Sequence, residues 1–501
     1  MICAALSNNS ARDGGHLRRI TCRKQDIQTS QESPTGEPIS LRVDPMNLPS
    51  SSVKKLIPAL ALGALLTSCA VAPSAPERQA NAQADRIGAS YRPSGHKPAL
   101  PALTAGSSQA DFVRFAVLNH PQVEAAYYEW RASVAAIAPA RALPDPQFTF
   151  QADVTDTLMS FMPGLMFDLM TPGKRSAMAR EAAASSGVYY RDFVSAVLAA
   201  AADARKAWIE LAFVDESARL GEAAGASLEE SVALADTDYV TGRGMSTLEA
   251  RLRLENEIAK TRTELASLGD RLAAARTRFK SALGLLPGDP DPVWPQATLV
   301  STELPGEDEL WRRAQAANPE LGRMRAMVEM SVASVEVARK AGTPDFSLGA
   351  MVDLKASPLM LRPTATVTLP VWREKIAANI SAATARNRAA GARVSAEQLS
   401  VAAELAQMLY MVRESERMIA YIDGTALPNL DRIVASVEAG YQTGMSGPAM
   451  IPEARLMALN MRRERIAALR DREIAATDLM LMTADIVPPG DPLPADASTA
   501  P

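Results

Sequence analysis

Few side chains in this sequence could do chemistry. The 501 residues include only three cysteines and three histidines. We find no glycine-rich nucleotide-binding loop and no convergent group of carboxylates of the kind that catalytic motifs contain. A net charge of −4 argues against nucleic acid as a partner, because phosphate binders normally carry a basic excess. His96 and His120 are far apart and are predicted to be ordinary surface or helix-capping residues. We therefore expect no enzyme activity, no cofactor and no metal-ligand set.

The reactive residue that stands out is Cys69. Lys54 and Lys55 precede an apolar stretch, residues 56–66, that is too short to span a bilayer. The stretch ends in Leu-Thr-Ser followed by Cys69. This arrangement resembles a bacterial lipobox, whose cysteine is lipidated (for example with palmitate) and becomes the first residue of the mature chain. We predict a lipoprotein signal peptide at 46–68 and lipidation of Cys69; the alternative is an apolar run that ends by chance at a free cysteine.

The segments around this signal carry little periodicity. Residues 1–45 are polar and irregular, so we interpret Met46 as the natural start and 1–45 as a misassigned or unstructured segment. Residues 69–106 are rich in Ala, Pro and Ser and are predicted to form an extended, lipidated tether. In lipoproteins that resemble this one, a residue other than Asp after the cysteine, here Ala70, implies sorting to the outer membrane. Residues 486–501 are predicted to be a disordered tail.

The rest of the chain consists of one unit that occurs twice. Five short motifs recur in the same order about 200 residues later. The pairs are Asn119-His120-Pro121 with Asn318-Pro319, Leu143-Pro144-Asp145-Pro146 with Thr343-Pro344-Asp345, Pro172-Gly173-Lys174-Arg175 with Pro370-Val371-Trp372-Arg373, Tyr239-Val240-Thr241-Gly242 with Tyr441-Gln442-Thr443-Gly444, and Glu249-Ala250-Arg251-Leu252 with Glu453-Ala454-Arg455-Leu456. We therefore predict a tandem repeat with units at 107–284 and 309–485 and a connector at 285–308.

Each unit contains a predicted β-hairpin. Apolar residues occupy alternate positions in four segments, which is the pattern of strands with two different faces. The hairpins are predicted at 145–170 and 344–369, with turn residues at 155–164 and 355–363. Such strands suit a half-buried soluble sheet or a membrane barrel, and roughly 9–11 residues is the length of a tilted membrane strand. Because the smallest outer-membrane barrels use about eight strands, several chains would have to build one.

Long helices follow each hairpin. A helix over residues 174–240, which contain no proline, would be roughly 100 Å long. Apolar residues recur with the heptad spacing of coiled coils, at Val194, Val197, Ala201, Ala204, Trp208 and Leu211 and, on the return arm, at Ile258, Leu265, Leu272 and Phe279. We predict coiled-coil hairpins at 173–284 and 371–485, with a kink at Pro428. Shorter helices are predicted before the β-hairpins, at 121–142 and 319–341.

Paired units of helix, β-hairpin and very long helical hairpin behind a lipobox resemble the TolC family of outer-membrane efflux ducts, and the likeness covers about residues 108–485. The resemblance implies a mainly α fold with a small β part. It further implies a homotrimer whose strands form a 12-stranded β-barrel continuous with a periplasmic α-barrel. Such ducts carry no chemistry; they work with a periplasmic adaptor (membrane fusion protein) and an inner-membrane pump, commonly of the resistance-nodulation-division type. The implied location is the outer membrane, with a lipid anchor and helices reaching into the periplasm.

The resemblance also implies two groups of functional residues. The tips of the helical hairpins would gate the duct and contact the adaptor, through Tyr239, Gly242, Gly244, Glu249, Tyr441, Gly444, Met450 and Glu453. Glu453 could form an acidic ring in a trimer, or could simply be a solvated residue at a helix start. The residues where strand becomes helix would anchor the chain at the membrane interface, or merely serve solubility; they are Lys174, Arg175, Trp372, Arg373 and Lys375.

The cargo is the least determined part of the prediction. Methionines are frequent in the strand regions, at Met159, Met162, Met166, Met170, Met178, Met351 and Met360. Thioether sulfur prefers soft cations such as Cu(I) or Ag(I), but methionine also fills gaps in flexible structure. The sequence around the hairpins resembles the heavy-metal export branch more than the multidrug branch. Metal cations and drugs both stay open as the cargo. An alternative of another class is a lipid-anchored periplasmic coiled-coil scaffold or adaptor.

Overall fold

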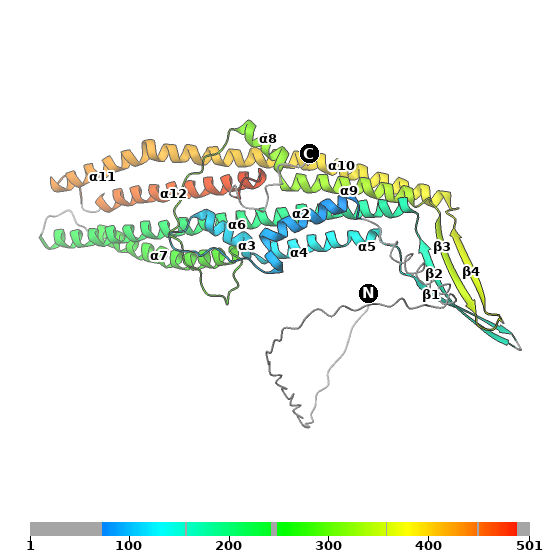
Figure 1. The fold of residues 1–501 in the computed structure, drawn as a ribbon. Helices are drawn as coiled ribbons and strands as arrows, with labels where there is room; N and C mark the ends of the chain where they lie inside the picture. Colours follow the sequence, from blue (N-terminus) through cyan, green and yellow to red (C-terminus); the bar gives the residue numbers. More distant parts are fainter. Residues whose placement is uncertain (1–72, 156–157, 242–247, 357, 448–449, 488–501) are drawn as a thin grey trace, which may run out of the picture. The chain divides into compact units, whose positions relative to one another are not determined.

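The protein is mainly helical, with one small sheet (Figure 1). A computed structural model describes residues 73–155, 158–241, 248–356, 358–447 and 450–487. The elements are α2 (Ala75–Tyr91), η1 (Pro93–Gly95), α3 (Gln109–Asn119), α4 (Pro121–Ala135), α5 (Ile137–Arg141), β1 (Gln147–Thr155), β2 (Leu158–Leu169), α6 (Pro172–Thr241), α7 (Leu248–Ala282), α8 (Glu307–Ala317), α9 (Pro319–Lys340), β3 (Asp345–Asp353), β4 (Met360–Thr368), α10 (Arg373–Tyr421), η2 (Ile422–Ala426), α11 (Leu427–Gln442) and α12 (Met450–Met482). The predicted fold class is confirmed.

The repeated Asn-Pro motifs begin corresponding helices in the two units. In the second unit, the Asn318 side chain accepts hydrogen bonds from the amides of Glu320 and Leu321, both at 3.0 Å, and Pro319 is the first helical residue of α9. In the first unit, His120 caps α4 by accepting from the amide of Gln122 at 3.3 Å. A side-chain acceptor followed by proline is a strong helix start, because proline needs no hydrogen-bond partner there. The capping role predicted for His120 is confirmed.

The four strands form one antiparallel sheet in the order β1-β2-β3-β4. The pairing of β2 with β3, from Gly164↔Met351 to Leu169↔Phe346, joins the two hairpins. The register places apolar side chains opposite one another on one face, such as Phe148 with Leu165, and polar ones on the other face, such as Ser347 with Asp168. The sheet therefore has two chemically distinct faces, as the alternation predicts.

The predicted turns at 155–164 and 355–363 are too long. Strand β2 already begins at Leu158 and β4 at Met360. Pro163 and Gly164, which favour turns, lie inside β2, and Pro363 lies inside β4. Proline has no backbone N–H, so it is tolerated in a strand at a position where that N–H would not have paired with a neighbouring strand. That condition holds here, because the pairing of β2 with β3 starts only at Gly164 and β4 is an edge strand.

The long helix α6 organises the helical part. It runs for 70 residues and packs against α4, α7, α9 and α12. The six heptad positions predicted on its first arm are all buried, from Val194 to Leu211. Buried aromatic rings fill the space between α6 and the short helices, with Trp130 stacked on Phe193 at a centroid distance of 5.7 Å. Among the helices in the described part of the chain, none combines the length and apolarity needed to cross a membrane.

The prediction of an extended tether at 69–106 is wrong for its described part, because residues 75–91 form helix α2. Ser74 and Glu77 cap this helix reciprocally, with both hydrogen bonds at 3.3 Å. Ala84, Ile87 and Tyr91 lie on one helical face and are fully or almost fully buried. Three apolar positions in a polar segment are too few for a clear periodic signal, so only the packing reveals the helix.

The second helical hairpin is interrupted where the sequence predicts a kink. Between α10 and α11 the backbone forms one π-helical turn, η2, directly before Leu427 and Pro428. Proline cannot donate to the preceding turn and collides with its carbonyl. A π-turn relieves that conflict by widening the helix locally. The first hairpin has no such break, since α6 is continuous over Pro172–Thr241.

Replacing Gly284 by alanine is predicted to destabilise the protein. Gly284 has a φ of +72°, and an added Cβ would lie 2.7 Å from the Cα of His120 and 3.0 Å from the carbonyl oxygen of Asn119. A left-handed conformation alone costs a residue with a side chain about 1–3 kcal/mol. The midpoint of thermal unfolding should fall, whereas Gly288→Ala, with open space around it, should leave the midpoint unchanged. Equal midpoints for both variants would contradict this account of Gly284.

Candidate functional site: hairpin tips, sheet junction and connector

The predicted site residues fall at opposite ends of the long helices (Figure 1). In the first tip, Gly242 and Gly244 lie outside the described residues. Tyr239 is in α6 and Glu249 in α7, but their side chains also lie outside the described part. The second tip is described on both sides, with Tyr441 in α11.

The second tip turns through two glycines. Gly444 has a φ of +77°, which glycine adopts without strain. The amides of Met445 and Ser446 both donate to the carbonyl of Gly440, at 2.8 and 3.1 Å, and so close the end of α11. A Cβ on Gly440 would lie 2.3 Å from the Ser446 Oγ. Sequence reasoning found Gly444 but missed Gly440; the spacing Gly-x-x-x-Gly was the available signal.

Met450 and Glu453 begin helix α12, and both side chains are exposed. Ile451 and Pro452 between them are buried, so the first turn of α12 is packed on one side and free on the other. A carboxylate in the first turn is favoured by the helix dipole. The position of Glu453 therefore agrees with both interpretations of this residue.

Two arginines on α12 bind the second hairpin to the first. Arg455 pairs with Glu230 of α6 at 2.7 Å and with Glu438 of α11 at 2.7 Å. The hydrogen bonds that Arg455 donates to the Glu438 carboxylate raise the pKa of Arg455. Arg463 pairs with Glu264 of α7 at 3.2 Å. The repeat comparison pointed to Arg455 only as part of a motif, because a pairing across 225 residues cannot be read from spacing.

The junction between sheet and helices joins the two units again. Lys174 of α6 forms an ion pair with Asp345 of β3 at 2.5 Å, and the Thr171 hydroxyl donates to the carbonyl of Pro344 at 2.6 Å. Lys174 therefore has a structural partner within the chain. Arg175 is half-buried.

On the second unit, the junction is strongly exposed. Trp372 is 75% exposed and is flanked by exposed Leu369 and Val371. Arg373 and Lys375 follow, also exposed. An exposed indole beside aliphatic and cationic side chains is the composition of a membrane-interface anchor. The structure thus brings three of the five predicted anchor residues together in one exposed segment.

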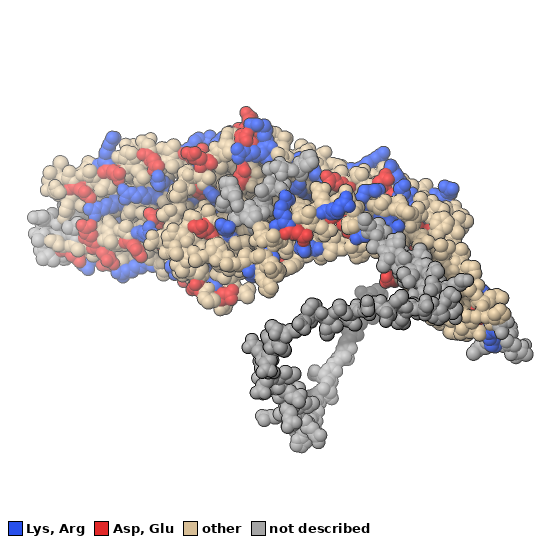
Figure 2. Space-filling view, in the orientation of Figure 1, with Lys and Arg blue, Asp and Glu red and all other residues tan. Residues whose placement is uncertain are grey.

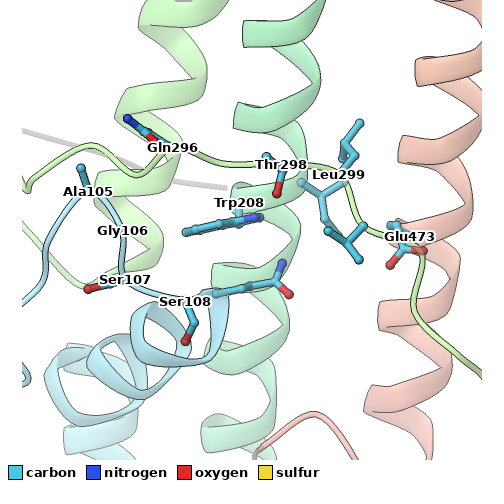
Figure 3. A pocket seen from close by; sticks show the side chains of 12 residues that line it. Ala105, Gly106, Ser107, Ser108, Trp208, Gln296, Thr298, Leu299 and Glu473 are labelled. Carbon is cyan, nitrogen blue, oxygen red and sulfur yellow. The ribbon is translucent and has the colours of Figure 1, made fainter.

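The connector between the units is held by charged side chains beside a pocket that Glu473 helps to line (Figure 3). A hollow of ≈ 370 Å³ lies between Trp208, residues 105–109, residues 296–300 and Glu473. The Glu473 carboxylate accepts from the Thr302 amide at 3.0 Å, from the Thr302 hydroxyl at 2.6 Å and from Arg472 at 2.5 Å. Arg205 also donates to the Thr302 hydroxyl at 2.6 Å, and burial lowers the pKa of the Arg205 guanidinium.

Because every oxygen of Glu473 is engaged, this carboxylate holds the connector against α6 and α12 rather than serving as an acid or base. Sequence analysis did not identify it. Over the residues that the structure describes, no group of three His, Cys, Asp or Glu side chains is placed to hold a metal ion.

Comparison with known proteins matches residues 310–485, the second unit, to the family described as outer membrane efflux protein. Similar solved structures include CusC, with a TM-score of 0.65 and 17% identity over 76% of this chain and 93% of CusC. VceC of Vibrio cholerae gives a TM-score of 0.62 and 16% identity over 76% of this chain and 96% of VceC. The MtrE outer membrane channel of Neisseria gonorrhoeae gives a TM-score of 0.63 and 16% identity over 78% of this chain and 93% of MtrE. No curated protein matches the sequence.

Removing the Glu473 carboxylate is predicted to destabilise the protein strongly. Glu473→Ala would leave partly buried Arg205 without its ion-pair partner and buried Arg472 with its pair to Glu416, and breaking a buried ion pair from one side costs up to about 3–5 kcal/mol. Thermal unfolding in detergent measures the loss. Glu229→Ala is the matched control, because its pair with Arg262 is exposed and worth at most about 1 kcal/mol. A Glu473→Ala protein as stable as the control would show that the contacts of Glu473 contribute little to stability.

Proposed function

We propose that this chain, whose residues 310–485 match the outer membrane efflux protein family, is a member of that family and the outer-membrane channel of a tripartite efflux system. The family is one of channels rather than enzymes, as the sequence predicts. The observation that carries the proposal is the two-faced sheet attached to long helical hairpins. The channel would receive substrates from a periplasmic adaptor and an inner-membrane pump and release them outside the cell.

The sheet supports a position in the membrane because its apolar face is uncovered. Phe148 and Phe150 are each 67% exposed, and Leu361 is 64% exposed. In the view of Figure 2, charged side chains are spread along the helices, while the strands are largely uncharged. A large exposed apolar patch marks a surface that another apolar phase covers. Lipid would cover this face, and the polar face would line water.

The edges of the sheet support assembly from several copies. Strands β1 and β4 are the two edges, and backbone groups at an edge have no partner in hydrocarbon. Three chains of four strands each would give twelve strands and close the ring. The helical hairpins of three chains would then form a tunnel through the periplasm. Lipidation of Cys69, which lies outside the described residues, would add an anchor at the outer membrane.

The hairpin tips are the proposed gate and adaptor contact, and the arginines on α12 would hold that gate closed. Arg455 and Arg463 link α12 of the second hairpin to α6 and α7 of the first. Tips that move apart must break these pairs, a shift between two packed arrangements of rigid elements. Because Arg455 and Glu230 are partly exposed, each pair is weak enough to break reversibly. Glu453 would lie near the opening and could favour cations.

The cargo is proposed to include soft metal cations such as Cu(I) or Ag(I). Met162, Met166, Met351 and Met360 lie on the polar face of the sheet, which would line the water-filled channel along which ions pass. Organic solutes or drugs are the alternative cargo for the same duct. Growth of a deletion strain on copper and silver, compared with growth on hydrophobic drugs, distinguishes the two.

The full-length protein is predicted to be a trimer that conducts ions. Solubilised in detergent, it should migrate as three copies by light scattering with detergent subtraction, and it should produce discrete conductance steps in planar bilayers. A periplasmic scaffold would behave differently. If a Cys69→Ser variant is a soluble monomer and the lipidated form conducts nothing, the channel proposal fails and the scaffold is favoured.

Removing the links between hairpins is predicted to open the channel. The double variant Arg455→Ala/Arg463→Ala should show a larger single-channel conductance than the unaltered protein, because no ion pair then joins α12 to the first hairpin at these positions. Arg462→Ala is the matched control, since Arg462 pairs with Asp431 of α11 within the same hairpin. The gate assignment would be wrong if the control opened the channel as far as the double variant.

A further inference from the structure

Three methionine side chains gather around one glycine on the polar face of the sheet. Met162, Gly164 and Met166 are alternate residues of β2 and so share a face. Met351 of β3 is the direct partner of Gly164 in the neighbouring strand. Because the opposite residue has no side chain, Met351 stands between the two methionines of β2.

The close approach is measurable at Gly164. A Cβ built on this glycine would lie 2.5 Å from the Cγ of Met351, so the Met351 side chain occupies the space that a larger residue would fill. Diagonal neighbours across two strands are roughly 7–8 Å apart at their backbones, within the reach of long side chains. The thioethers of Met162 and Met166 can therefore turn toward the sulfur of Met351.

The three methionine side chains are at least partly shielded from solvent. Met162 is 1% exposed, while Met166 and Met351 are of intermediate exposure. Polar residues lie across the ladders from these methionines, with Gln151 opposite Met162 and Arg362 opposite Met351. Most apolar side chains of these strands lie on the other face, so a continuous apolar core does not account for the three methionines.

We propose that Met162, Met166 and Met351 form a binding site for a soft monovalent cation, Cu(I) or Ag(I), on the channel wall. Three neutral sulfur ligands match the preference of these ions for thioethers. Without a carboxylate or thiolate among the ligands, the ion keeps its charge and is released readily. A conducting pathway needs sites that bind ions and also let them leave. The proposal rests on the proposed function, because that function makes the polar face the lumen; a trimer would carry one such site on each chain.

The test is a calorimetric titration of the full-length protein in detergent with silver nitrate, in chloride-free buffer. The unaltered protein should bind Ag(I), and Met162→Leu/Met166→Leu/Met351→Leu should bind it at least about tenfold more weakly. Leucine replaces methionine with little change in volume, so the strands should keep their packing. Met418→Leu/Met445→Leu/Met457→Leu is the matched control, because it removes three exposed methionines outside the sheet and should bind Ag(I) as the unaltered protein does.

A second variant separates geometry from sulfur content. Gly164→Ala removes no thioether, but its Cβ would lie 2.5 Å from the Met351 Cγ and 2.8 Å from the carbonyl oxygen of Ala350, so it should weaken Ag(I) binding. Light scattering on the same variant shows whether the trimer persists. Equal binding by the triple variant and its control would overturn the proposal, as would Zn(II) binding as tight as Ag(I).

Conductance in planar bilayers, measured on the same preparations, tells two failures apart. A protein that conducts but binds no Ag(I) would retain the channel function and lose the site. A protein that neither conducts nor binds Ag(I) would lose both.

Discussion

The pairing of β2 with β3 is the constraint on which the rest of this structure depends. It joins the hairpin of one unit to the hairpin of the other, from Gly164↔Met351 to Leu169↔Phe346. The register decides which side chains share a face, and a slip of one residue would exchange the two faces. With this register, every strand contributes apolar residues to one side and polar residues to the other. The apolar face, the open edges and the methionine cluster all follow from that single ladder.

The helical part has a comparable constraint, provided by buried and partly buried charged side chains rather than by backbone pairing. Glu473 and Arg205 hold the connector to α12 and α6, while Lys174 and Asp345 join the base of α6 to β3. These links occur at the middle and at the sheet end of the helices. Near the tips, the connections are exposed pairs that water and salt weaken. The connector pair is thus the best shielded from water, and the pairs near the tips are more accessible.

Sequence patterns predicted the elements that depend on local rules. Heptads located α6, and an acceptor followed by proline marked the starts of α4 and α9. The patterns failed where long-range contacts decide. Helix α2 is stabilised by burial of Tyr91 in an aromatic cluster that no local signal announces. Arg455 and Glu473 gain their roles from partners far away in the chain, and Pro163 is tolerated in β2 because the pairing of β2 with β3 stops at Gly164.

The two units have the same order of elements but differ in helix continuity and in the size of their buried clusters. This difference indicates which hairpin would move in the proposed gate. Helix α6 is one continuous helix set against α2, α3 and α4, and it carries most of the aromatic core. The corresponding path in the second unit passes through the π-turn η2 and Pro428, and only a smaller buried cluster supports it. Helices bend at such breaks because the regular ladder of hydrogen bonds is already interrupted. A gate that opens by bending would therefore move the second hairpin around η2, while the first hairpin remains the fixed wall.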